Sequence, residues 1–302
     1  MRKTTPKGII LLLLTAVIWG SSFVAQSIGS RSVEPFTFMA VRTAIGTLVL
    51  LPVVIFMGGG FRKLLTPATV KAGLILGIDF FIAQNLQQFA FNYSTAGKIA
   101  FLTALYMFIV PVIGLFIGKK VAPLTWVAIS MALIGMFLLC VDPDELSSIN
   151  KGDILAVACA LFYAVQIMLI DRFTGENIDG IGLSFMEFLT AAVITSIMMF
   201  IFEKPSPAGI MAAAPALLYS GIMSCGIAYT LQIIGQKHAS PVAASLLMSL
   251  ESVFAALAGW IILNETLTPK ELAGCAVMFA AIILSQLSES VSTFKRKSEQ
   301  IS

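Results

Sequence analysis

The chain has 302 residues, of which 58% are hydrophobic and only 12% are charged, whereas a soluble domain carries about 25% charged residues. With a mean hydropathy of +0.94, this composition predicts an integral membrane protein with several spans. The net charge of +3 is small and no basic run alternates with aromatic residues, so no nucleic-acid partner is expected. The four cysteines lack the spacing of a metal site or a disulfide framework, and we expect no metal and no cofactor.

Ten apolar stretches are long enough to cross a bilayer as helices, which predicts an all-α membrane protein. The first stretch is longer than the apolar part of a signal peptide and no clear cleavage site follows it, so we interpret it as a retained helix. The connections are short and rich in proline and glycine, which leaves no room for a soluble catalytic domain. The expected spans are residues 8–29, 36–57, 70–92, 95–117, 123–141, 152–171, 180–202, 211–236, 241–263 and 268–287.

Lysine and arginine are distributed unevenly between the connections. Most of them fall on the side of the membrane that holds both ends of the chain. The opposite side is poor in positive residues, and its central connection is acidic. Its charged residues include Arg31, Lys151, Lys204 and Lys270, with Asp142, Asp144 and Glu145 in the central connection. Because positive connections stay on the cytoplasmic side, we expect both termini in the cytoplasm. The expected location is a bacterial inner membrane.

Five spans precede the acidic connection and five follow it, which divides the chain into two similar halves. Residues 1–145 would form a first five-helix repeat and residues 146–288 a second, followed by a polar cytoplasmic tail over 289–302. An odd number of spans gives the two halves opposite orientations, as in many secondary transporters. Four residues of the first half recur about 145 residues later: Leu102, Leu105, Gly114 and Ile117 match Leu247, Leu250, Gly259 and Ile262.

Polar side chains recur at matching positions of the two halves, inside spans that are otherwise apolar. In the first span, three polar or amphipathic residues follow helical spacing and share one face. The third span carries four amides within five residues, more than hydrogen bonding between helices needs, although that bonding is the alternative role. We predict that these groups surround a water-filled cavity and contact a substrate. The predicted contacts are Trp19, Ser22, Gln26, Gln84, Gln88, Tyr106, Tyr163, Gln166, Tyr229, Gln232 and Glu251.

Four charged side chains lie deep inside the expected spans, where an unpaired charge would cost at least about 2.5–3.5 kcal/mol. Arg42, Asp79 and Glu187 are interpreted as internal charges. They either form an ion pair, such as Arg42 with Asp79, or recognise the charge of a substrate and act in gating. Glu251, near the middle of the ninth span, is the strongest candidate for proton coupling. The alternatives for Glu251 are a bond to a substrate amine or to neighbouring tyrosine and glutamine side chains.

Two further predictions concern single residues of the fourth span. Lys98 lies three residues inside the end of the span and is expected to extend its ammonium group to the membrane surface. Pro111 should kink the helix, because its ring clashes with the preceding turn and it lacks the N–H that would bond there.

Four stretches of the chain carry a family resemblance: AVIWGSSFV at Ala16–Val24, FMAVRTAIG at Phe38–Gly46, NYSTAGKIAFL at Asn92–Leu102 and, in the second half, the whole of Ser240–Gly274. They resemble the EamA-type exporters of the drug/metabolite transporter superfamily. The resemblance covers nearly all of residues 8–287. It implies ten helices in two inverted repeats, alternating access, a central cavity lined by both halves, and export of amino acids or related metabolites.

These patterns together predict a secondary carrier for a small polar or amphipathic metabolite, with proton coupling as one option. A channel or a lipid-handling membrane protein is the alternative. No enzyme activity and no catalytic residue are expected, because the chain has one histidine, outside the membrane core, and no HExxH motif. The expected partners are a small-molecule substrate and the lipid bilayer. Since one chain holds both repeats, it can fold as a monomer, and a dimer is left open.

Overall fold

The computed structural model describes residues 4–57, 66–141, 149–176, 178–263 and 266–299, and every regular element in these ranges is a helix. Within these ranges ten spans are long and apolar enough to cross a membrane, as the sequence predicts. The acidic residues of the central connection lie outside the described ranges. The elements are α1 (Pro6–Gly29), α2 (Pro35–Met57), α4 (Pro67–Ala90), α5 (Ala96–Thr103), α6 (Tyr106–Phe116), α7 (Pro123–Cys140), α8 (Lys151–Gly175), α9 (Gly180–Phe202), α10 (Pro207–Ala212), α11 (Ala214–Tyr219), the π-helix η2 (Ser220–Ala228), α12 (Tyr229–Gln236), α13 (Pro241–Met248), α14 (Glu251–Leu263) and α15 (Pro269–Glu299).

Proline and hydroxyl side chains set where several helices begin. Thr5 and Thr66 cap α1 and α4, and each side chain accepts a hydrogen bond from a backbone N–H three residues later. A proline follows each cap at the first helical position, where its fixed backbone angle suits a helix and its missing N–H would have no partner. Ser240 and Pro241 open α13 in the same way. These span boundaries are therefore encoded locally.

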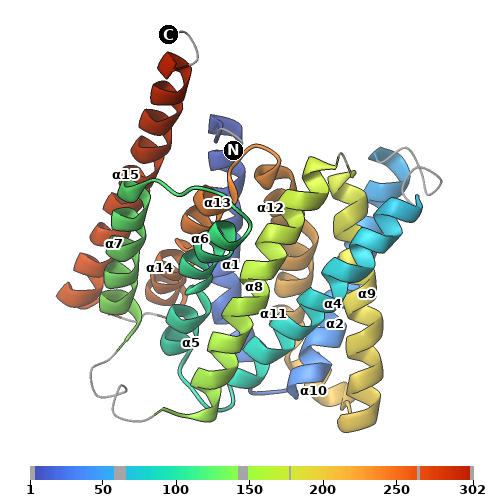
Figure 1. The fold of residues 1–302 in the computed structure, drawn as a ribbon. Coiled ribbons are helices and arrows are strands. Elements are labelled where there is room, and N and C mark those ends of the chain that lie inside the picture. Colours follow the sequence, from blue (N-terminus) through green and yellow to red (C-terminus); the bar gives the residue numbers. More distant parts are fainter. Residues whose placement is uncertain (1–3, 58–65, 142–148, 177, 264–265, 300–302) are drawn as a thin grey trace.

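Helix α1 lies in the middle of the molecule (Figure 1). It packs against α12, α13 and α14, which all belong to the second half. On one side of the molecule α2 and α4 pack on α9, and on the other side α7 runs along α15 (Figure 1). The interface between the two halves therefore runs through the core of the molecule, where it can enclose a site.

The fourth and ninth spans are each broken at the same place in their half. In the fourth span, α5 ends at Thr103 and α6 begins at Tyr106. In the ninth, α13 ends at Met248 and α14 begins at Glu251. Tyr106 and Glu251 are the residues that the repeat pairs with each other, so the break places both at the start of a short helix in the interior.

The break in the fourth span does not lie at Pro111, where the sequence predicts a kink. Helix α6 continues through Pro111, and the break lies at Ala104–Leu105. There the N–H of Met107 bonds to the carbonyl of Ala104, only three residues earlier. The ninth span has Ala256 at the position equivalent to Pro111, yet it breaks at the same place. The break is therefore a property of the repeat and does not require the proline.

Two glycines let the halves approach closely beside the polar interior. A Cβ atom on Gly20 of α1 would lie 2.6 Å from the carbonyl oxygen of Glu251 in α14. A Cβ atom on Gly77 of α4 would lie 2.7 Å from the carbonyl oxygen of Glu187 in α9. Both contacts are with backbone atoms of the second half, so a side chain at either glycine would push the halves apart. Small residues at such positions are typical of packed membrane helices.

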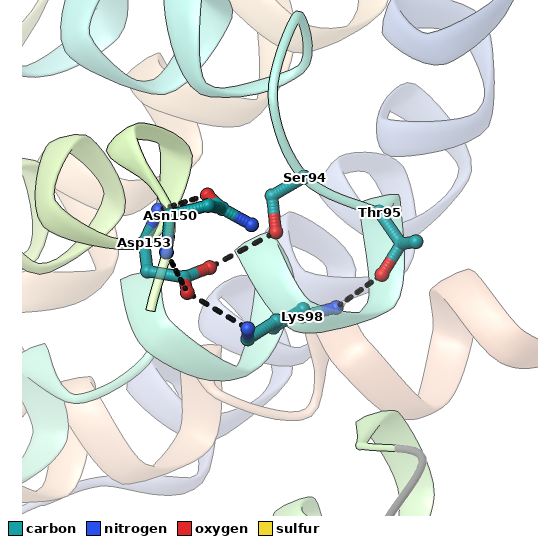
Figure 2. Close-up of polar contacts among 5 residues, drawn as sticks. All are labelled: Ser94, Thr95, Lys98, Asn150 and Asp153. Carbon is teal, nitrogen blue, oxygen red and sulfur yellow. Dashed lines mark hydrogen bonds and ion pairs between the residues drawn. The ribbon is translucent and has the colours of Figure 1, made fainter. Parts of the chain in front are cut away.

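A buried ion pair also joins the two halves (Figure 2). Lys98 Nζ in α5 lies 2.7 Å from Asp153 Oδ2 in α8, and both side chains are only 9% exposed. The prediction that Lys98 extends to the membrane surface is therefore wrong. Asp153 also accepts hydrogen bonds from Ser94 Oγ at 3.1 Å and from the backbone N–H of Asn150 at 3.0 Å. These bonds hold the carboxylate within reach of the lysine, which gives the ammonium group a partner inside the protein.

Candidate functional site

A small polar cavity of about 30 Å³ lies between the two halves. Its wall combines two charged side chains with tyrosines, amides and hydroxyl groups, contributed by helices of both halves. A cavity of this volume holds about two water molecules and is too small for a metabolite, so the site is closed in this structure. The lining residues are Trp19, Ser22, Phe23, Gln26, Arg42, Gln87, Thr103, Tyr106, Tyr163, Gln166, Ile167, Ser224, Tyr229, Gln232, Met248 and Glu251.

The structure brings together most of the side chains that the sequence predicts to contact substrate. All of them except Gln84 and Gln88 line the cavity. Gln84 is turned toward α9, where its Nε2 atom donates to Thr195 Oγ1 at 3.5 Å. Gln87 takes their place in the wall, and Tyr163 Oη donates to Gln87 Oε1 at 3.5 Å. The repeat could have identified Gln87 as a wall residue, because Gln87 lies at the position equivalent to Gln232 in the other half.

Aromatic contacts hold Tyr229 in its place in the cavity wall. The ring centroid of Tyr229 lies 4.6 Å from that of Trp19 and 4.8 Å from that of Phe80. The first contact is tilted and the second is edge-to-face, and the edge-to-face arrangement is favourable for aromatic rings. The indole Nε1 of Trp19 and the Oε1 of Gln232 are buried and have no hydrogen-bond partner among the described residues. The wall therefore offers a substrate apolar faces together with a donor and an acceptor.

Arg42 lines the cavity and is held by neutral side chains. Its Nη1 donates to Gln26 Oε1 at 2.7 Å, its Nη2 to Ser224 Oγ at 2.9 Å, and its Nε to Cys225 Sγ at 3.1 Å. No ion pair between Arg42 and Asp79 occurs in the described part of the chain. The suggested pairing of these two residues is therefore wrong. The π-helix η2, whose wide turns recur at functional sites, presents the neighbouring Ser224 and Cys225 to Arg42 instead.

Asp79 and Glu187 lie outside the cavity wall, in the packed contact between α4 and α9. Gln166 Nε2, from the wall, donates to Glu187 Oε1 at 2.6 Å. The second oxygen of Glu187 and Oδ2 of Asp79 are buried without a hydrogen-bond partner among the residues that the structure describes. Gln166 therefore connects the cavity with a second, acidic region next to it.

Glu251 and Tyr106 meet across the cavity wall. Tyr106 Oη donates to Glu251 Oε1 at 3.1 Å, and both side chains are buried. These residues occupy matching positions in the two halves, so the bond joins the starts of the two short helices α6 and α14. The breaks in the fourth and ninth spans therefore lie next to each other, and the Glu251 carboxylate lies where they meet.

No cluster of three or more histidine, cysteine, aspartate or glutamate side chains suited to a metal occurs in the described ranges. The four cysteines are free thiols. The polar wall is instead made of hydrogen-bonding groups and of two opposite charges, which is chemistry for binding a solute rather than for converting it.

Ten spans and a polar cavity between two halves define a membrane transporter. The chain matches the EamA-like transporter family over residues 6–141 and 150–287, and it belongs to that family. Each half matches separately, in agreement with the duplication that the sequence predicts. The protein is therefore a transporter of the drug/metabolite type and not an enzyme.

Curated relatives and a solved structure resemble the chain over most of its length. An uncharacterized transporter of Archaeoglobus fulgidus is 30% identical over 280 residues, which is 91% of this chain and 84% of that protein. The threonine/homoserine exporter RhtA of Escherichia coli K12 is 25% identical, over 92% of this chain and 90% of RhtA. A crystal structure at 21% identity superposes with a TM-score of 0.77 over 92% of this chain and 97% of that chain, which supports the fold.

Proposed function

We propose that this protein is a secondary carrier that moves a small polar or amphipathic metabolite out of the cell by alternating access. An amino acid or a related compound is the proposed substrate. The observation that carries the proposal is the cavity between the halves, where Arg42 and Glu251 face one closed polar space. The relative RhtA, a threonine/homoserine exporter by name, supports this substrate class and the direction of transport.

The closed state of the cavity supports alternating access over a permanent channel. A free volume of about 30 Å³ admits water but no metabolite, so the wall must open before substrate enters. The breaks in the fourth and ninth spans supply short helices that can move separately from their neighbours. Broken helices beside a central site are typical of secondary transporters. The positive residues of the connections support an orientation with both termini in the cytoplasm. A bacterial inner membrane is the proposed location of the carrier.

Proton coupling through Glu251 is part of the proposal. A buried carboxylate at the meeting point of the two halves can take up a proton from one side and release it to the other. The titratable and charged groups around it are Tyr106, which donates to it, and the further side chains of the cavity and its surroundings: Arg42, Tyr163, Tyr229, Cys140 and Cys159. None of the described neighbours forms an ion pair with Glu251, which leaves the carboxylate available for exchange.

A ligand screen followed by counterflow tests the carrier function. Purified protein in detergent is heated with single amino acids and related metabolites, and a substrate should raise its melting temperature. At a concentration 100 times its Kd, a ligand stabilises the folded state by about 2.7 kcal/mol. In liposomes the same compound should accelerate the uptake of its own labelled form, and this exchange should saturate. Flux that does not saturate and shows no counterflow would contradict a carrier and favour a channel.

A further inference from the structure

The cavity contains two opposite charges that do not neutralise each other. Arg42 is 3% exposed and Glu251 is 4% exposed, and both line the same cavity. No ion pair in the described ranges includes either of them. A buried charge without a counter-ion is costly, because neutral hydrogen-bond partners stabilise it less than an opposite charge does. The site thus presents one guanidinium and one carboxyl group that a molecule could satisfy once the wall opens to admit it.

The guanidinium of Arg42 is fixed before any ligand arrives. Gln26 in α1 and the consecutive residues Ser224 and Cys225 in η2 each accept one of its hydrogen bonds. An arginine side chain carries five N–H donors, and its planar fork matches a carboxylate. Because its surrounding partners are uncharged, the strongest partner it could gain is an anionic group of the ligand.

Glu251 supplies the opposite charge from the other half of the molecule. Arg42 belongs to α2 of the first half, whereas Glu251 begins α14 of the second half. The bond from Tyr106 Oη holds one oxygen of the Glu251 carboxylate in the wall. A molecule that contacts both charges after the wall has opened to admit it would therefore bridge the two halves.

We propose that the cavity binds a zwitterion, with its carboxylate on Arg42 and its ammonium group on Glu251. This inference rests on the proposed carrier function and names the residues that select its substrate. Arg42 is thereby a specificity-determining residue and not an internal structural charge. When substrate leaves the open carrier, Glu251 can take up a proton in place of the ammonium group, so one carboxylate serves both substrate and proton.

Matched analogues test the two ends of the zwitterion separately. The first probes are L-threonine, the amino alcohol L-threoninol, which lacks the carboxylate, and 2,3-dihydroxybutyrate, which lacks the ammonium group. Alanine, alaninol and lactate form a second set, and any amino acid found in the screen is added with its own analogues. In liposome counterflow the amino acid should exchange at least about tenfold faster than either analogue, because each analogue leaves one buried charge unpaired.

Two variants assign the ends to residues. Arg42→Gln should lower amino-acid exchange. It should also bring the ratio of the amino-acid exchange rate to the amino-alcohol exchange rate close to one. Glu251→Gln should instead lower the ratio of the amino-acid exchange rate to the hydroxy-acid exchange rate. Lys119→Gln removes a charge from the partly exposed pair of Lys119 with Asp171, outside the cavity wall, and both preferences should stay at the wild-type values. These ratios compare two solutes on the same protein sample, so a lower yield of folded variant does not change them.

The possible outcomes separate the two proposals. Saturable exchange of amino alcohol or hydroxy acid as fast as the amino acid would overturn the zwitterion while the carrier function stands. The zwitterion is also overturned if Arg42→Gln lowers the exchange of amino acid and amino alcohol by one common factor. If no probe in either set or in the screen shows saturable exchange, both the carrier function and the zwitterion fail.

Discussion

Replacing Glu251 with glutamine is expected to remove the transport that a pH gradient drives, while the protein still folds and inserts. Glutamine keeps the size of the side chain and can accept the hydrogen bond from Tyr106 Oη that now joins the two halves at 3.1 Å. It cannot bind and release a proton, so flux can no longer draw on the gradient. The measurement is uptake into liposomes with and without an imposed pH difference, at equal amounts of reconstituted protein.

Two further variants make the result specific to the carboxylate. Tyr106→Phe removes the hydrogen bond but keeps the carboxylate, so the residual flux should still respond to the gradient. Arg42→Gln should weaken substrate binding and also leave a gradient response. Flux through the Glu251→Gln variant with the same dependence on the pH difference as the wild type would refute proton coupling at this residue.

Replacing Lys98 with methionine is expected to destabilise the protein strongly. The change leaves Asp153 as a buried carboxylate without the cation that now lies 2.7 Å away. Breaking a buried ion pair by removing one partner costs about 3–5 kcal/mol when the remaining charge has no other partner. Asp153 keeps its hydrogen bonds from Ser94 and Asn150, so we expect a loss near the lower end of that range. The measurement is the free energy of unfolding in a mild detergent, or the melting temperature under the same conditions.

The chain offers a matched control for this change. Lys119 Nζ lies 2.8 Å from Asp171 Oδ2, a nearly identical bond, but the side chains are 34% and 17% exposed. The remaining carboxylate is less buried there, so Lys119→Met should cost clearly less stability than Lys98→Met. If the two variants lose the same stability, burial does not determine the contribution of the Lys98 pair.

The spans and much of the site could be predicted because their signals are local or repeated. A long apolar stretch opened by a cap and a proline identifies a membrane helix without knowledge of its neighbours. The positions of Trp19, Tyr163 and Glu251 in the cavity wall follow from helical spacing and from the match between the halves. Their role in binding substrate stays a prediction, since the geometry places them together but contains no substrate.

The features that sequence reasoning missed depend on tertiary contacts. Lys98 and Asp153 are far apart in sequence, and nothing local indicates that their helices meet. In the third span the amides spread over about half of the helix circumference, so periodicity could not decide between Gln87 in the wall and Gln84 against α9. The partners of Arg42 depend on the π-helix η2, which no local pattern predicted.

Accessibility of the cavity from both sides of the membrane tests the central claim most directly. A cysteine replaces Ser22, a small side chain in the wall, after the four native cysteines are changed to serine or alanine and transport is verified. A membrane-impermeant maleimide should label this cysteine when added from either side of the membrane, and the transported substrate should protect it from both. Labelling from one side alone, or labelling that substrate does not reduce, would contradict a carrier that opens one central cavity alternately to the two sides.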